Sequence, residues 1–155
     1  MNENEPLLSV SDLKVQFRTE DGVVKAVDGL SYELARGRTL GIVGESGSGK
    51  SVSNLAILGL HNPMTSTVTG EIKFNGQNLV GAKDSAMEKL RGNEISMIFQ
   101  DPLTSLSPFY TIGEQIAETY RRHTGASKSK ARKRAVEMLT KVGIPQPDRR
   151  VDDYP

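Results

Sequence analysis

GESGSGKS, at residues 44–51, fits the pattern GxxxxGK[ST] of a phosphate-binding loop at every fixed position. The apolar run 39–43 before it has strand character, and residues 52–60 after it favour a helix, which is the setting that this motif requires. The alternative is a glycine-serine linker, whose chance of matching four fixed positions is on the order of one per cent in a chain this long. The sequence therefore predicts a nucleotide site at this loop.

The residue types of the loop suit a triphosphate. Backbone amides of residues 46–51 would line a concave anion site above the positive end of the following helix. Glycines at 44, 47 and 49 would allow positive φ and a close approach to the phosphates. Lys50 would reach the β- and γ-phosphates, and the Ser51 hydroxyl would hold Mg²⁺.

Composition excludes several other classes of function. The 155 residues carry 20 basic and 19 acidic side chains, a net charge of +1, so no global field favours nucleic acid or an anionic membrane surface. The absence of cysteine excludes a disulfide framework or a thiolate metal site in these residues. The polar, acidic start at 1–6 differs from a signal peptide, and no apolar run approaches the ~18 residues of a membrane span.

The first third of the chain predicts an antiparallel layer. Leu13, Val15 and Phe17 alternate with polar residues, and 21–22 supplies a turn. The return strand continues the alternation with Val24, Ala26, Leu30, Tyr32 and Leu34. Residues 70–74 favour another strand that enters a tight hairpin at 75–76, and 95–99 favours a further strand.

The last third predicts helices. Capping-box spacing occurs at Ser85 with Glu88 and at Thr111 with Glu114. Two apolar stripes follow, and the second ends at 143–145: Ile112, Ile116 and Tyr120, then Ala131, Ala135, Met138, Leu139 and Val142.

Two polar features of the chain are predicted to be structural. The cations that crowd the start of the second of these helices are interpreted as a solvated face, because no aromatic residues interleave with them as nucleic-acid platforms require; they are Lys128, Lys130, Arg132, Lys133 and Arg134. His61 is interpreted as a solvated helix-end residue, because no second His or Cys pairs with it as a metal ligand.

Two stretches together resemble the ATP-binding subunits of ABC transporters, specifically the oligopeptide, dipeptide and nickel import group. They are LGIVGESGSGKS at 40–51 and MIFQDPLTSLSP at 97–108, the latter similar to the group's Q-loop except for Ser107, where asparagine is more usual. The resemblance implies an α/β fold, the P-loop NTPase fold of the ABC type, which has a parallel core sheet, an antiparallel β subdomain and a helical subdomain, here truncated before the signature motif. Residues 1–155 would form the N-terminal part of one nucleotide-binding domain, with the antiparallel layer and P-loop core at 1–100 and the Q-loop and helical subdomain at 101–155.

The resemblance also implies roles for individual residues. Gln100 would act catalytically, approaching Mg²⁺ and the γ-phosphate, and would share the metal with Ser51. Phe17 would stack on adenine, or it is simply the last core residue of its strand. The full expected nucleotide-binding set is Phe17, Gly44, Glu45, Ser46, Gly47, Ser48, Gly49, Lys50, Ser51 and Val52. Two alternatives concern the Q-loop: Asp101 as a Walker B carboxylate, or an ordinary polar loop after an edge strand.

Members of the resembled family continue into an LSGGQ signature, a Walker B strand and a switch histidine, none of which occurs in these residues. We therefore interpret the chain as the N-terminal part of such a subunit, either a cut piece or a shortened gene product. We expect it to bind Mg-ATP weakly at best and to show no measurable turnover. Without the later strands, the strand before the P-loop would lack a neighbour and expose apolar surface.

The implied function is the ATP-binding component of an importer that takes up peptides or nickel, peripheral at the cytoplasmic face of the membrane. Its partners would be a second nucleotide-binding subunit, two permease subunits and, indirectly, an extracytoplasmic substrate-binding protein, with no nucleic acid. One alternative is a small P-loop kinase, in which the pairs 121–122 or 149–150 would clamp phosphate. The other is a non-catalytic nucleotide-binding fragment that competes with an intact subunit.

Overall fold

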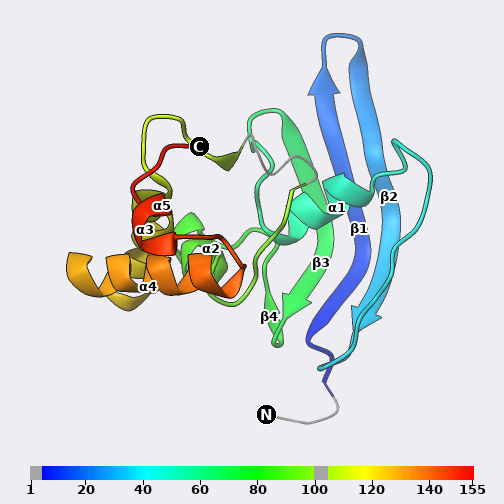
Figure 1. The fold of residues 1–155 in the computed structure, drawn as a ribbon. Helices are drawn as coiled ribbons and strands as arrows, with labels where there is room; N and C mark the ends of the chain where they lie inside the picture. The colour runs from blue at the N-terminus through cyan, green and yellow to red at the C-terminus, as the bar shows by residue number, and fades with distance from the viewer. Residues whose placement is uncertain (1–4, 100–104) are drawn as a thin grey trace. The chain divides into compact units, whose positions relative to one another are not determined.

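A computed structural model describes residues 5–99 and 105–155 of the chain. The chain divides into two compact units, 1–88 and 89–155, and each is described here by itself. The first unit contains a β-sheet and helix α1, and the second contains a helical hairpin (Figure 1). No helix within the described residues is long and apolar enough to cross a membrane.

The first unit is built on a four-stranded antiparallel sheet in the order β2-β1-β3-β4. Its strands are β1 (Leu8–Thr19), β2 (Gly22–Leu34), β3 (Ser66–Phe74) and β4 (Gln77–Asn78). The predicted antiparallel layer and both predicted turns are confirmed. At the second turn Asn75 and Gly76 have φ values of 50° and 78°, the left-handed pair that a tight hairpin requires.

Strand β1 carries a bulge centred on Asp12, where its pairing with both neighbouring strands shifts register. Asp12 has φ 46°, and its amide donates to the Ser31 hydroxyl over 2.9 Å. On β3, Gly70 has φ 96°, and a Cβ there would lie 2.4 Å from the carbonyl oxygen of Asp12. The extra residue changes the alternation of faces, so Val10 and Leu13 are both buried although an odd number of positions separates them.

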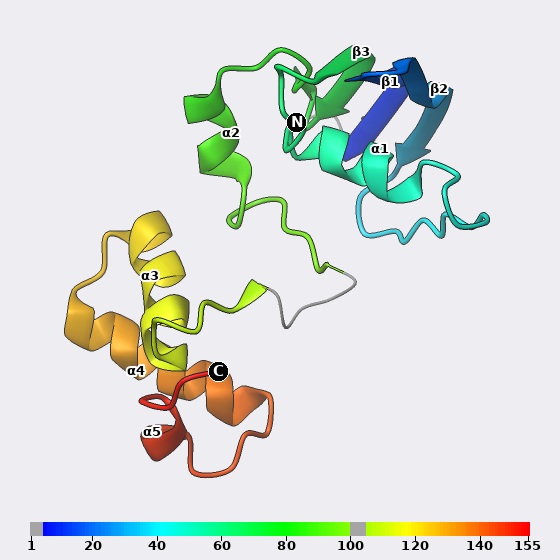
Figure 2. The same ribbon diagram turned by 90° about the horizontal axis from the view of Figure 1, so that it is seen from above.

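The core of this unit lies on one face of the sheet, where α1 (Lys50–Ile57) contacts β1 and β2 (Figure 2). The apolar alternation predicted for the return strand does not place Val24 in the core: its side chain is 51% exposed near the hairpin end, and Val27 is the buried valine of β2. The physical reason is the register shift between 15 and 16 of β1, which a strict alternation does not anticipate. The buried apolar residues of the unit are Val10, Leu13, Val15, Val27, Ala56, Ile57, Leu58, Ile72, Phe74, Leu79 and Met87.

The strands predicted at 39–43 and 95–99 are absent, since both stretches lie outside any strand and only Ile95 forms an isolated parallel bridge, with Arg91. A strand exists only when a neighbour accepts and donates its ladder hydrogen bonds, and among the described residues neither stretch has such a neighbour. The accompanying expectation of exposed apolar surface before the P-loop is confirmed, because Leu40, Ile42 and Val43 are 42%, 40% and 94% exposed.

The second unit centres on two antiparallel helices, α3 (Ile112–Thr124) and α4 (Lys128–Lys141), followed by the short α5 (Pro147–Arg150). The capping box predicted at Thr111 and Glu114 is confirmed in both directions. The one predicted at Ser85 is wrong, because α2 (Asp84–Leu90) already begins one residue earlier, with Asp84 in its first turn. A carboxylate is favourable at that position beside the positive helix end.

Small residues on α4 allow close packing in this unit. Ala131, Ala135 and Leu139 are buried together with Val151, and Ile112 packs against this cluster. The segment after α5 is tied to the start of α3, since the amide of Ile112 donates to the carbonyl of Asp153 over 2.9 Å and that of Gly113 donates to Val151 over 2.8 Å. The predicted apolar stripe of α4 is therefore confirmed at its three buried positions, but it is wrong at Val142, which follows the helix as its C-cap and is 73% exposed.

Candidate nucleotide-binding site

The P-loop leads directly into α1, whose N-cap is Gly49 with φ 86°. The first amides of a helix have no intrahelical acceptor, so those of Lys50 and Ser51 belong to the free, positive end of α1. No acidic side chain occupies this first turn and no side chain caps it. The amides therefore remain available to an anion such as a phosphate group.

The glycines of the loop serve different purposes. Gly47 and Gly49 have the positive φ that the sequence predicts, 81° and 86°. At Gly44 this expectation is wrong, because its φ is not in the left-handed region. A Cβ there would instead meet the Ser48 hydroxyl at 2.8 Å, so glycine is needed for the close return of the loop.

Gly49 also fixes the loop against the sheet. A Cβ at this position would lie 2.5 Å from the carbonyl oxygen of Ala26 and 3.2 Å from Cγ2 of Val27. Any larger residue would push the start of α1 away from β2. The antiparallel sheet thus positions the phosphate-binding end of α1, a contact that the motif alone does not reveal.

The Lys50 ammonium group folds back over the loop. Its Nζ donates to the carbonyl oxygens of Gly44 and Glu45 over 2.7 and 2.6 Å, and to the Ser48 hydroxyl over 3.1 Å. A positive charge is thereby placed within the same bend that presents the helix amides. The combination of a fixed cation and free amides is suited to phosphate oxygens.

The remainder of α1 anchors this end of the helix. Ser53 is 1% exposed, and its hydroxyl donates to the carbonyl of Lys50 over 2.8 Å. Ala56 and Ile57 are buried on the side of the sheet. Ser51, the expected Mg²⁺ ligand, is exposed one position after Lys50, so its hydroxyl is accessible to a metal held by phosphate.

Phe17 and His61 form a pair that sequence reasoning missed. Their ring centroids are 5.4 Å apart with planes at 81°, an edge-to-face contact, and both side chains are half-buried. His61 Nε2 donates to the carbonyl of Val52 in α1 over 2.8 Å, so the histidine is not the solvated residue that the sequence predicts. Because 44 positions separate the two rings along the chain, no local pattern signals this contact.

No metal cluster of three or more His, Cys, Asp or Glu side chains occurs in the part of the chain that the structure describes. Gln100, the expected catalytic and metal-binding residue, and Asp101, its alternative, lie outside the described residues.

Gln115 of α3 holds residues 107–110, where the stretch that resembles the Q-loop ends, in a fixed shape. Its Nε2 donates to the carbonyls of Ser107 and Tyr110, each over 3.0 Å, and its Oε1 accepts from the amide of Ser107 over 2.9 Å. No local sequence pattern singles out this glutamine, because its partners lie in the preceding loop and not on the helix. The exposed Phe109 belongs to this fixed loop.

A glycine-rich bend that joins a lysine to the free end of a helix defines a P-loop nucleotide-binding protein. Comparison with known sequences narrows this class: the family described as "ABC transporter" matches residues 27–155, and the chain belongs to this family. The resemblance identified from the sequence is therefore confirmed.

Three relatives are named as ATP-binding proteins of peptide, dipeptide or oligopeptide transport. A putative peptide import ATP-binding protein of Brucella melitensis is 49% identical over 97% of this chain and 45% of its own length. The dipeptide transport ATP-binding protein DppD of Escherichia coli is 48% identical over 96% of this chain and 46% of its own. The oligopeptide transport ATP-binding protein OppD of Bacillus subtilis is 49% identical over 96% of this chain and 42% of its own length. The chain thus spans less than half the length of these relatives.

Solved structures of similar fold are ATP-binding cassettes. One, a dimeric cassette in a post-hydrolysis state bound to ADP and Pi, superposes with a TM-score of 0.79 at 24% identity, over 96% of this chain and 61% of that one. A second dimeric cassette of a bacterial ABC transporter superposes with a TM-score of 0.78 at 22% identity, over 95% of this chain and 61% of that one. The α/β fold of the ABC type is therefore confirmed for this chain, although the strands predicted for its parallel core sheet are not formed among the described residues.

Proposed function

We propose that this chain belongs to the ATP-binding component of an ABC importer that powers the uptake of peptides or nickel by binding and hydrolysing ATP. Residues 1–155 are the N-terminal part of its nucleotide-binding domain, with the P-loop core in 1–100 and the Q-loop and helical subdomain in 101–155. The observation that carries the proposal is the position of Lys50, whose ammonium lies in the bend beside the free amides of α1.

The nucleotide is held mainly through its phosphates. The loop amides and Lys50 would bind the phosphate oxygens, and the Ser51 hydroxyl and Gln100 would hold Mg²⁺, with Gln100 also sensing the γ-phosphate. Phe17 lies against the adenine, with His61 fixing its ring from the side by the edge-to-face contact. Mg²⁺ supplies charge neutralisation between the phosphates when it is bound.

Transport requires partners. Two nucleotide-binding subunits and two permease subunits assemble at the cytoplasmic face of the membrane, and a substrate-binding protein delivers the cargo outside. Support for peptides as the cargo comes from relatives named for peptide, dipeptide and oligopeptide transport at 48–49% identity. Nickel remains within the proposal because the Q-loop resemblance covers both cargoes.

Titration calorimetry of the 155-residue chain with Mg-ATP tests the site. We expect weak binding, which Lys50→Ala weakens about 10- to 100-fold because a charge-assisted hydrogen bond to phosphate contributes about 1.5–3 kcal/mol. Lys73→Ala removes the same charge from a half-buried position on β3 and is expected to leave the affinity unchanged. Equal affinities for the Lys50→Ala and unsubstituted chains would contradict the proposal.

A chimaera tests the transport role. The matching segment of the E. coli dipeptide subunit, which is 48% identical, is replaced by this chain in cells that lack that subunit. We expect dipeptide uptake to return, and Lys50→Ala in the chimaera to abolish it. A chimaera that accumulates normally and joins its permeases, yet supports no uptake, would exclude this function.

The kinase and fragment alternatives give different outcomes. A kinase transfers the γ-phosphate to a small acceptor, so phosphorylated product formed by the isolated chain would favour that class. Co-purification with permease subunits without ATP turnover would favour a non-catalytic fragment. Arg121 and Arg122, which the kinase alternative uses as a phosphate clamp, lie at the C-terminal end of α3 in the second unit.

A further inference from the structure

The net charge of +1 conceals a strong local segregation of charge. The segment 121–134, which we call the basic hairpin end, contains seven Lys and Arg residues and no Asp or Glu. The rest of the chain therefore carries 13 basic and 19 acidic residues, a net charge of −6. The basic hairpin end comprises the last turn of α3, a connection at 125–127, and the first half of α4.

The helical hairpin brings these charges together in space. Gly125 ends α3 with φ 67°, and Ser127 caps α4, so only three residues separate the two helices. Residues 128–134 occupy about 10 Å of helix at 1.5 Å per residue. This is close to one Debye length at physiological salt, so the charges act on a partner as one patch.

Some of these cations are neutralised within the chain, and others are not. Arg132 forms a bidentate ion pair with Asp152, with hydrogen bonds of 2.6 and 2.8 Å, and Arg134 forms an ion pair with Glu137 over 3.1 Å. Arg121 and Lys128 line a surface hollow together with Glu114 and Glu118, which partly offset their charge. Lys130 and Lys133 are exposed and form no ion pair with any described residue.

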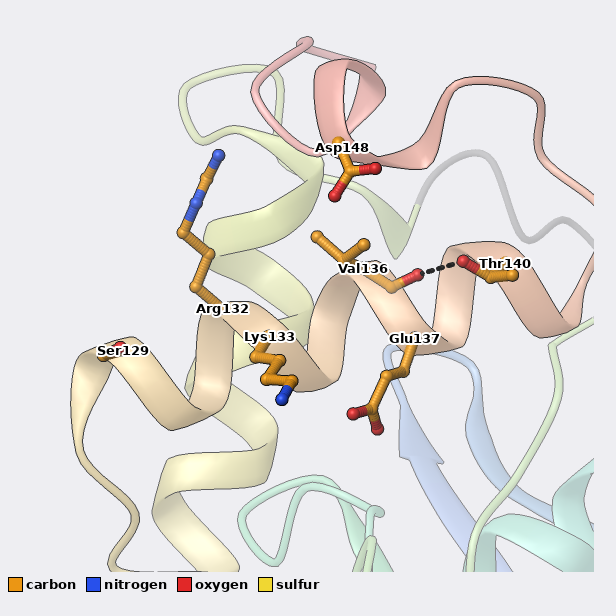
Figure 3. Close-up of a pocket in the computed structure, with 7 residues that line it drawn as sticks. All are labelled: Ser129, Arg132, Lys133, Val136, Glu137, Thr140 and Asp148. Carbon is orange, nitrogen blue, oxygen red and sulfur yellow. Dashed lines mark hydrogen bonds between the residues drawn. The ribbon is translucent and has the colours of Figure 1, made fainter.

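The positions of these two lysines leave them free for a partner. Glu137 is the single carboxylate of α4, and Arg134 already engages it. Lys133 lines a surface hollow together with Glu137 and Asp148 (Figure 3), but it forms no ion pair with either carboxylate. The solvent face of α4 thus presents uncompensated positive charge.

Helix electrostatics strengthen the patch. The N-terminal turn of α4 contains no acidic residue, although that end of a helix favours anions and disfavours cations. Lys128 and Lys130 therefore add to the positive end of the helix. This arrangement costs stability within the chain, and an anionic partner would relieve it.

A permease loop, a nucleic acid or an anionic lipid surface could in principle bind such a patch. The choice among them rests on the proposed importer function. Cytoplasmic loops of membrane proteins carry an excess of Lys and Arg, so permease loops would repel it. Single-stranded nucleic acid needs aromatic platforms, and segment 121–134 contains no Phe, Tyr or Trp. The inner membrane leaflet is anionic and attracts clusters of four to eight Lys and Arg.

We propose that the basic hairpin end docks on the anionic phospholipid headgroups of the membrane beside the permeases. The exposed Lys130 and Lys133 contact the phosphates, and the other cations of the segment add long-range attraction. The patch supplements the permease contacts and holds the second unit at the membrane surface.

Vesicle sedimentation tests the proposal with the 155-residue chain. The vesicles contain either phosphatidylcholine alone or equal parts of phosphatidylcholine and phosphatidylglycerol. We expect binding only to the anionic vesicles, and its loss at high salt, where the Debye length falls to about 3 Å. The double variant Lys130→Gln, Lys133→Gln should reduce partitioning about 30-fold, because each lysine near the membrane surface contributes about 1 kcal/mol to binding.

A matched variant controls for net charge. Lys83→Gln with Lys89→Gln removes the same charge from exposed positions outside the segment and should leave partitioning unchanged. Glutamine is a good helix former, so α4 is expected to survive, which circular dichroism checks. Equal loss in both double variants, equal binding to both vesicles, or tighter binding to single-stranded RNA than to anionic vesicles would overturn the proposal.

Nucleotide binding separates this proposal from the proposed function. Mg-ATP titration of Lys130→Gln, Lys133→Gln should match that of the unsubstituted chain, because the substitutions lie outside the P-loop. Normal titration with no vesicle binding refutes the lipid contact alone. Vesicle binding without any Mg-ATP binding refutes the nucleotide function and also removes the reason for choosing lipid over other anions.

Discussion

The two units of the chain reach their folds by different routes. The unit at 1–88 depends on pairing between strands far apart in sequence, with β1 held between β2 and β3 and a bulge that both neighbours accommodate. The unit at 89–155 depends on consecutive helices, with a capping box, a left-handed C-cap and small residues on α4. Substitutions in the sheet unit are therefore expected to disturb distant strands, and those in the helical unit to act locally.

The largest effect is expected at the β1 bulge. Gly70→Ala places a Cβ 2.4 Å from the carbonyl oxygen of Asp12 and forces a non-glycine residue to φ 96°. We expect the free energy of unfolding of the sheet unit to fall by about 3–5 kcal/mol from strain and backbone displacement. Residue-resolved hydrogen exchange measures the stability of each unit separately. It should show that amides across β1, β2 and β3 lose protection.

The control for this substitution is Gly37→Ala, which has φ 67° but open space around the added Cβ. It should cost about 1 kcal/mol from backbone conformation alone. Similar losses at both positions would show that the close approach of β3 to the bulge does not matter.

A smaller and more local effect is expected at the start of α3. Gly113→Ala places a Cβ 2.4 Å from Cγ2 of Val151 and 2.5 Å from its carbonyl oxygen, without unfavourable φ. Overpacking of this kind costs about 2–3 kcal/mol. The protection lost should be confined to the helical unit, whereas Gly125→Ala, with nothing within 4 Å, should cost about 1 kcal/mol.

The next smaller loss of stability is expected at the capping box of α3. Thr111→Ala removes the hydroxyl that accepts from the amide of Glu114 over 3.2 Å and is expected to cost about 1 kcal/mol. Exchange should rise in the first turn of α3 and leave the sheet unit unchanged. Thr119→Ala, on the exposed part of the same helix, is the matched control, and an equal cost there would argue against a capping contribution.

The smallest effect concerns the ion pair at the end of the chain. The hydrogen bond from Arg132 lowers the pKa of Asp152. Because the folded pKa lies below the unfolded one, the pair stabilises the helical unit above the unfolded pKa and ceases to do so as the pH falls through the folded value. Carbon-detected NMR titration should find the pKa of Asp152 higher in Arg132→Gln than in the unsubstituted chain, and an unchanged value would exclude the pair in solution.

Sequence patterns predicted the elements whose partners lie close along the chain. Thr111 with Glu114, the 75–76 turn and the stripe of Ala131, Ala135 and Leu139 each depend on residues within a few positions of one another. Where the outcome depended on distant strands, the patterns failed: the alternation of the return strand does not place Val24 in the core, and the strands predicted at 39–43 and 95–99 are absent. Period-two alternation cannot report a bulge or a missing neighbour.

In the candidate site, too, the sequence predicted features that depend on nearby residues and missed contacts between distant ones. The motif identified Lys50 and the loop glycines, and two of those glycines have the predicted conformation. It did not reveal that Gly49 abuts Ala26 of β2 or that His61 meets Phe17 edge-on. These contacts join residues more than 20 positions apart, and only the folded sheet brings them together.

The sequence by itself determined the family, the phosphate-binding loop and the helix ends, because each follows from residue types at short fixed spacing. Tertiary structure decided which valine of β2 is buried, how the sheet positions the first turn of α1, and that seven cations gather at one end of a helical hairpin. Strand register and helix pairing are set by contacts between distant residues, whose free energy no local pattern contains.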